Sequence, residues 1–243
     1  MHSHICITFV IILLFPIAVS AHGLEPELAV DPGKLPGEIA YLLERPVEWL
    51  EVNIFTVSTK KKQEKKLAFA SERVAELGAL LYIPNVKEKN LKIASDRYRY
   101  YLESAEDMAE KIIFLDGAQI GLAERFEEET RLQEKFLREL KEGAPAAEFT
   151  AEIAEVLGIA RAQNEKIFKF IVEKYQANEA DIRKHRIILT KHESLVKEAM
   201  IVVKDQEKLQ RVSDLLAEAE KFRLAGLNLE AYSLISQAKD SVY

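Results

Sequence analysis

The side chains best suited to chemistry include two histidines near the C-terminal end. His185 and His192 lie seven positions apart on one expected helix. Two helical turns separate such residues by about 10 Å, which is too far for one zinc ion without a third ligand between them. We therefore expect surface histidines and no metal site. No other pattern points to a cofactor, and we expect none.

Clustered carboxylates form the second chemical group. Glu127, Glu128 and Glu129 are consecutive, and a further group comprises Glu103, Glu106, Asp107 and Glu110. Consecutive helical positions fan around the helix, whereas paired catalytic carboxylates share a cleft that shifts their pKa values. The sequence also lacks a Gly-rich phosphate loop, a Gly-x-Ser-x-Gly motif and a His-Glu-x-x-His motif. We expect no catalytic residue, and a hydrolase is the least supported class of protein.

Lysines gather in one dense run, Lys60-Lys61-Lys62-Gln63-Glu64-Lys65-Lys66. Lysines at a helix N-terminus oppose the macrodipole, so some compensating use is conceivable. Contact with anionic lipid headgroups or an anionic polymer of the cell envelope would be such a use. The alternative is a solvated helix face, which charge runs usually form.

Arginine and tyrosine alternate from Arg97 to Tyr101. Tyr98 and Tyr101 belong to an apolar stripe, which leaves Tyr100 with its neighbouring arginines outside it. Core packing and cation–π contacts explain this segment more simply than a platform for stacking nucleic-acid bases. The candidate interaction residues of the chain are therefore Lys60, Lys61, Lys62, Lys65, Lys66, Arg97 and Tyr100.

An apolar run from Ile5 to Val19 predicts export of the protein. Small residues precede His22 in the pattern of a signal peptide that is cut after Ala21. The run is short for a membrane span, and Pro16 interrupts it. Because no Lys or Arg precedes the run, a retained N-terminal anchor stays open as the alternative. The only cysteine, Cys6, lies in this leader, so the mature chain is expected to have no disulfide.

Composition indicates a helical protein with an acidic surface. The net charge is -6, and the first 21 residues contain no Lys, Arg, Asp or Glu. An acidic chain is a poor partner for nucleic acid, which is bound largely through its phosphates. Nine glycines and seven prolines in 243 residues allow few turns, and 30% of the residues are charged. Few turns and abundant helix formers favour long helices.

Apolar residues recur at three- and four-residue spacing, which predicts a series of helices. The first begins at Pro36, and Pro46 is expected to kink or split it. Residues 47–57 also alternate, which leaves a strand as the competing interpretation there. The stripe of this first helix comprises Ile39, Leu42, Leu43, Val47, Leu50, Ile54 and Val57.

Further helices are expected over residues 59–81, 91–115, 122–140, 146–171 and 178–203. Ser58 or Thr59 is suited to cap the N-terminus of the helix expected over residues 59–81. A tight hairpin follows, from Asp205 to Leu224 and from Asn228 to Ser241, with its turn at Ala225-Gly226. Helix continuity stays open at Gly117–Gly121 and at Gln176–Asn178.

The expected fold is all-α: an elongated bundle of six to eight long, mostly antiparallel helices with a C-terminal helical hairpin. The expected domain organisation comprises a signal peptide (1–21), an extended N-terminal arm (22–35), a helical bundle (36–204) and a C-terminal hairpin packed on the bundle (205–243).

The N-terminal half resembles a known family. Leu35-Pro36-Gly37-Glu38-Ile39-Ala40-Tyr41-Leu42-Leu43-Glu44-Arg45, followed by Glu48, looks like the opening of an uncharacterised exported helical domain of prokaryotic envelope proteins. That opening reads Pro, a turn, Tyr-x-Leu-Lys-Arg and a later Glu. Ala70–Leu77 is similar to the family's Ala-x-x-Arg-Leu-x-Glu segment, and 128–140 with Pro145 resembles its closing helix.

This resemblance covers about residues 35–171. Two departures concern the first helix, where Glu44 replaces the family's usual Lys and Pro46 is inserted. They imply a different angle for the first hairpin. The resemblance implies a helical fold and an export route, but it implies no activity and no site residue.

The C-terminal segment 215–243 resembles a single tetratricopeptide-like hairpin. The residues that fit this pattern are Ala219, Phe222, Gly226, Ala231, Ile235 and Ala238. Such repeats need about three neighbours to build a stable solenoid, so one copy indicates a hairpin that caps the bundle.

The sequence therefore predicts a non-enzymatic, extracytoplasmic scaffold or protein-interaction module of the periplasm, cell envelope or secreted fraction. Its expected partner is another exported or envelope protein, or an anionic envelope polymer, and not nucleic acid. Membrane contact is expected only through an uncleaved signal. The alternative is a periplasmic-type holdase chaperone, which should expose a contiguous apolar patch, whereas a scaffold should bury nearly all of its stripes.

Overall fold

The computed structural model describes residues 30–115, 120–144, 147–176 and 182–242. Within these ranges it contains eight α-helices, one π-helical segment and no strand, which confirms the all-α class. The leader (1–21) and residues 22–29 of the expected arm lie outside the described residues. No helix in the described ranges combines the length and the apolar character that a membrane crossing needs.

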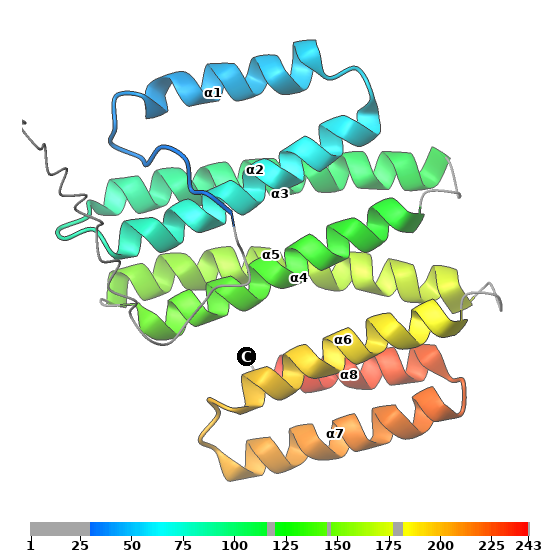
Figure 1. Cartoon of the computed structure of the whole chain (residues 1–243). Coiled ribbons are helices and arrows are strands. Elements are labelled where there is room, and N and C mark those ends of the chain that lie inside the picture. Colours follow the sequence, from blue (N-terminus) through cyan, green and yellow to red (C-terminus); the bar gives the residue numbers. More distant parts are fainter. Residues whose placement is uncertain (1–29, 116–119, 145–146, 177–181, 243) are drawn as a thin grey trace, which may run out of the picture.

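The helices form an elongated stack (Figure 1). At one end, α1 (Tyr41–Leu50) continues into the π-helix η1 (Glu51–Phe55) and lies over α2 (Thr59–Leu81) and α3 (Glu88–Leu115). The middle of the stack is α4 (Ile120–Gly143) and α5 (Ala147–Gln176). The other end is α6 (Ile182–Met200), α7 (Gln206–Leu224) and α8 (Asn228–Val242). The pairs α2–α3, α4–α5 and α7–α8 pack along their lengths.

One apolar core runs through the stack from α2 to α8. The predicted stripes of α2 and α3 are buried, as shown by Leu67, Val74 and Leu77 and by Tyr98 and Leu102. The core continues through Phe126, Ile153, Phe168, Leu189, Val196 and Ile235. Burial of each large side chain is worth about 1.5–3 kcal/mol, so packing supplies the stability that disulfides do not.

The bounds of the C-terminal hairpin agree with the prediction to within one residue. The Asp205 carboxylate accepts hydrogen bonds from the backbone N–H groups of Glu207 and Lys208 at 3.0 and 3.1 Å, which caps α7. Gly226 has a φ of +78° at the turn, a conformation that favours glycine. Ala219, Ala231 and Ala238 are fully buried, and these small side chains allow close approach of the helices.

The N-terminal helix differs from its prediction. It begins at Tyr41 and not at Pro36, because Gly37 adopts a φ of +106°, which no helix accommodates. Pro46 does not split it, since α1 runs through Pro46 to Leu50 and η1 continues it. Pro46 lies on the exposed side, where solvent satisfies the carbonyl that loses its partner. The competing strand over residues 47–57 is wrong.

Two questions of continuity are partly answered. α5 and α6 pack side by side, so they are two helices and not one bent rod (Figure 1). The residues between them, 177–181, lie outside the described ranges. Gly121 lies inside α4, whereas Gly117 falls outside the described residues.

Candidate interaction surface

α1 turns its apolar residues away from the rest of the protein. At about 100° per residue, Tyr41 and Glu48 share one side of the helix and Leu42 and Val47 lie on the other. Tyr41 and Glu48 are buried, whereas Leu42 is 74% exposed and Val47 58% exposed. The predicted stripe therefore exists, but it is not packed against the core as the stripes of α2 and α3 are.

We call the outward residues the α1 face: Leu42, Leu43, Val47, Trp49, Leu50 and Ile54. Further exposed apolar side chains flank this set at Ile39, Phe55 and Val57. Trp49, the only tryptophan of the chain, is 56% exposed. Monomeric proteins rarely expose apolar side chains in such a contiguous group unless something binds them.

A buried ionic cluster lies beneath α1, and we call it the α1 clasp. It comprises Tyr41, Glu44 and Glu48 of α1, Glu72, Arg73 and Glu76 of α2, and Arg97 and Tyr101 of α3. Arg73 Nη1 lies 3.0 Å from Glu44 Oε2 and 3.2 Å from Glu48 Oε1. Arg73 Nη2 lies 2.9 Å from Glu76 Oε1.

Arg97 completes the clasp from α3. Its Nη1 donates to Glu44 Oε2 at 3.0 Å, and its Nη2 pairs with Glu48. The guanidinium lies 4.6 Å from the centre of the Tyr41 ring, a cation–π contact. The Tyr101 hydroxyl donates to Glu48.

The clasp sets the orientation of α1. The α1 backbone lies apart from the backbones of α2 and α3 (Figure 1). The long side chains of Arg73 and Arg97 join these helices to Glu44 of α1. A buried guanidinium without a counter-ion is strongly destabilising, so Arg73 and Arg97 need the carboxylates of Glu44 and Glu48. Because these carboxylates lie opposite the apolar residues, pairing them turns the α1 face outward.

The clasp contains more carboxyl groups than guanidinium groups. Four carboxyl groups, those of Glu44, Glu48, Glu72 and Glu76, share two guanidinium groups. Burial raises the pKa of Glu76 to about 8, although Arg73 and Arg97 oppose the change. Burial also raises the pKa of Tyr41 to about 12. Glu76 therefore holds a proton at neutral pH, which relieves repulsion among the carboxylates.

This protonation predicts that the contribution of Glu76 to stability falls as pH rises from about 4.5 to about 8. The unfolded chain releases the Glu76 proton near its ordinary pKa of 4.5, whereas the folded chain holds it up to about 8. In that window the folded state binds more protons, so the free energy of unfolding decreases with pH. Each tenfold change in proton affinity is worth about 1.4 kcal/mol.

Glu76→Gln, which resembles the protonated form, should flatten this dependence and be more stable than wild type at pH 9. Urea unfolding at pH 5, 7 and 9 measures both effects. Glu218→Gln, on the exposed side of α7, is the control and should keep the wild-type slope. An unchanged slope in Glu76→Gln would show that Glu76 is ionised throughout.

A second polar cluster lies in the core, around His192. This histidine is fully buried, so its prediction as a surface residue is wrong; the side chain of His185 lies outside what the structure describes. The His192 ring stacks on Phe168, with centroids 3.5 Å apart and 4° between the planes. Its Nε2 lies 2.9 Å from Glu127 Oε1, so Glu127 does not point to solvent with its neighbour Glu128.

Burial keeps the imidazole ring of His192 neutral at neutral pH. Burial lowers the pKa of His192 and outweighs the opposing influence of Glu127. Burial alone would raise the pKa of Glu127, but the hydrogen bond with His192 and the nearby cationic groups, among them Arg131, together outweigh burial and lower that pKa. A neutral His192 ring that donates its Nε2–H to the ionised Glu127 carboxylate agrees with the lowered pKa of both residues.

Lys239 extends the same cluster to α8. Its Nζ lies 2.6 Å from Glu134 Oε2 and donates to Asn164 Oδ1 at 3.2 Å. The Asn164 amide donates in turn to the Glu127 carbonyl oxygen and to Thr130 Oγ1, at 2.9 and 3.0 Å. These bonds join α4, α5 and α8, and the linings of the depressions along α7 and beside Lys61 do not include these residues. The cluster therefore fixes helix positions.

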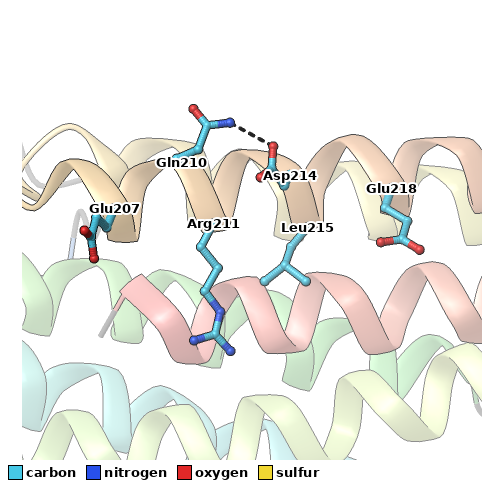
Figure 2. A pocket seen from close by; sticks show the side chains of 6 residues that line it. All are labelled: Glu207, Gln210, Arg211, Asp214, Leu215 and Glu218. Atoms are coloured by element: carbon cyan, nitrogen blue, oxygen red, sulfur yellow. Dashed lines mark hydrogen bonds between the residues drawn. The ribbon is translucent and has the colours of Figure 1, made fainter.

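Several depressions lined by described residues are shallow and open to solvent. One of about 460 Å³ runs along α7 (Figure 2) and is lined by Glu207, Gln210, Arg211, Asp214, Leu215 and Glu218. Gln210 donates to Asp214 at 2.9 Å, while Arg211 and Leu215 point toward the neighbouring helix. All six side chains come from one helix, so no opposite wall encloses a small molecule. Among the described residues, no group of His, Cys, Asp or Glu is placed to hold a metal ion.

In the structure, the lysines of the predicted basic surface fall into a group without a partner among the described residues and a group with partners inside the protein. Lys60 and Lys61 are exposed and Lys62 is half-buried, and none of the three pairs with another described residue. Lys65 pairs with Glu51 of η1, and Lys66 is buried against Ser104. Only the first three lysines of the run are therefore available to a partner.

The Arg97–Tyr101 segment likewise contains both buried and exposed side chains. Arg97 is a correction to the prediction, because α1 covers it and its guanidinium belongs to the clasp. Tyr98 and Tyr101 are buried as expected, and the Tyr98 hydroxyl donates to Gln133 at 3.0 Å. Tyr100 is 57% exposed, with its ring edge-on to that of Tyr101.

The sequence contained a signal for the clasp that the predictions missed. Tyr41, Glu44 and Glu48 recur at three- and four-residue spacing, which is a polar stripe opposite the apolar one. Comparisons of the chain with protein-family models, curated proteins and solved structures found no match.

Proposed function

We propose that the protein is a non-enzymatic helical scaffold and interaction module of the cell envelope, whose working surface is the α1 face. The observation that carries this proposal is an apolar helix face held outward by a buried ionic clasp. Exposed apolar surface is unfavourable in water, so a partner that covers it gains binding free energy. The apolar run at Ile5–Val19 supports export, and the partner is accordingly a component of the envelope.

Site-specific photo-crosslinking in cells tests this function. A photoreactive residue at Leu43, which is 68% exposed, should yield one recurring adduct with an envelope component. The matched control is Ile201, which is 83% exposed beyond α6 and lies off the α1 face. Equal adduct patterns at the two positions, or none at Leu43, would contradict the proposal.

A holdase chaperone is the second candidate, because the exposed α1 face meets the expectation of a contiguous apolar patch that binds unfolded chains. The apolar stripes of α2 to α8 are buried, as expected of a scaffold, so exposure of one helix face does not by itself separate the two candidates. A holdase would capture many unrelated exported proteins at Leu43. The purified protein would also suppress aggregation of a heat-unfolded model protein, and Leu43→Gln with Val47→Gln would abolish that effect. One recurring adduct together with no suppression of aggregation excludes this candidate.

A further inference from the structure

The α1 face has the composition of a helix that lies in a membrane interface. Interfacial helices place Trp, Phe and Leu on one side and charged groups on the other. α1 and η1 together span 15 residues, or about 22 Å of helix, and carry Trp49, Phe55 and three leucines outward. The helix therefore offers a ridge of apolar side chains, which suits a flat, deformable apolar layer.

Cations lie next to this ridge. Lys60, Lys61 and Lys62 follow η1 at the start of α2 and form no ion pair with a described residue. Arg45 is exposed at the flank of the α1 face. The acidic groups of the same helix are engaged, since Glu44 and Glu48 lie in the clasp and Glu51 pairs with Lys65.

This local positive charge contrasts with the whole chain, which carries a net charge of -6. An anionic surface would attract this end of the stack and repel the remainder. Each lysine near an anionic bilayer adds about fivefold to affinity. Charge and apolar surface thus select the same end of the molecule.

We propose that the α1 face binds the surface of an anionic lipid bilayer, with Trp49 and the leucines in the headgroup region and Lys60–Lys62 on the phosphates. This inference rests on the proposed function, because it names the partner of the same working surface. It departs from the expectation that an uncleaved signal would be the only membrane contact. The clasp holds α1 in the orientation that binding requires, so the helix does not have to refold on the bilayer.

Vesicle binding by the chain from His22 onward tests the inference. This chain contains every described element but not the apolar run at Ile5–Val19, which would bind lipid by itself. The protein should sediment with vesicles of equal parts phosphatidylglycerol and phosphatidylcholine, and its Trp49 emission should shift to shorter wavelength. Binding to pure phosphatidylcholine should be weaker, and salt should weaken binding to the anionic vesicles.

Three variants separate the contributions. Leu43→Gln with Val47→Gln should lower partitioning at least about tenfold while leaving the fold intact, because both side chains are exposed. Lys60→Gln with Lys61→Gln should lower it on anionic vesicles and reduce its salt dependence. The matched control, Ile201→Gln with Leu224→Gln, changes two exposed apolar residues outside the α1 face and should bind as wild type does.

Absence of wild-type binding, or binding that Leu43→Gln with Val47→Gln leaves unchanged, would overturn the inference. If vesicles are not bound but a photoreactive residue at Leu43 traps one envelope protein, the inference fails and the proposed function stands. Self-association that buries Trp49 without lipid would assign the face to a second copy of the chain, and would also overturn it. If the protein binds no vesicles and the photoreactive residue at Leu43 forms no adduct, both proposals are overturned.

Discussion

Arg73→Met is expected to release α1 and to lower the free energy of unfolding by about 3–5 kcal/mol, the usual cost of breaking a buried ion pair. Arg73 is fully buried and contacts four carboxyl groups, those of Glu44, Glu48, Glu72 and Glu76. Methionine fills much of the volume but removes one of the two cations that these groups share, and Arg97 contacts only Glu44 and Glu48 among them. Urea unfolding measures the loss, and hydrogen exchange at residues 41–55 shows whether α1 opens locally.

Arg125→Met is the matched control for this prediction. Arg125 also pairs with a glutamate, Glu64 at 2.9 Å, but its side chain is 60% exposed. Exposed pairs contribute about 0–1 kcal/mol, so this variant should unfold almost as wild type does. Equal losses in the two variants, or unchanged protection of α1 in Arg73→Met, would contradict the assignment of the clasp.

Lys239→Met is expected to destabilise the opposite end of the stack by a similar amount. Lys239 and Glu134 are both buried almost completely, so loss of the lysine leaves an uncompensated carboxylate in the core. Replacing both residues with methionine removes that charge, and exchange of a buried pair for apolar residues is often neutral. The double variant should therefore be nearly as stable as wild type. A loss of about 1 kcal/mol should remain, because Asn164 Oδ1 no longer accepts a hydrogen bond from Lys239.

Urea unfolding of the two single variants and the double variant gives the coupling energy of the pair. Lys169→Met is the control, because the Lys169–Glu173 pair lies on the surface of α5 with both side chains more than half exposed. It should change stability by less than about 1 kcal/mol. Additive losses at Lys239 and Glu134 would show that the pair is not coupled in the folded protein.

Apolar spacing predicted the helices well, because burial against any neighbour produces the same three- and four-residue pattern. The C-terminal hairpin from Asp205 to Ser241 illustrates this, since its cap, turn and small buried residues are all local. The same spacing correctly grouped Leu42, Val47 and Leu50 on one side of α1. It could not say which side faces inward, because that depends on Arg73 and Arg97, which belong to other helices.

The polar core was missed for a related reason. The pair at His185 and His192 was judged by its own spacing, whereas the partner of His192 is Glu127, 65 residues away on another helix. A local signal did exist, because His192 falls in register with the buried residues Leu189, Val196 and Ala199 of α6. Lys239 likewise falls in register with Ile235 and Val242. A polar residue inside an apolar stripe predicts a buried partner but does not identify it.

The fluorescence of Trp49 tests the outward orientation of α1 most directly, since no other tryptophan contributes. For the chain from His22 onward, shown to be folded by circular dichroism and monomeric by ultracentrifugation, we predict the long-wavelength emission of a solvated indole and efficient quenching by acrylamide. Emission at short wavelength with protection from acrylamide in that monomer would contradict this orientation, because it would show that α1 packs its apolar side against the core.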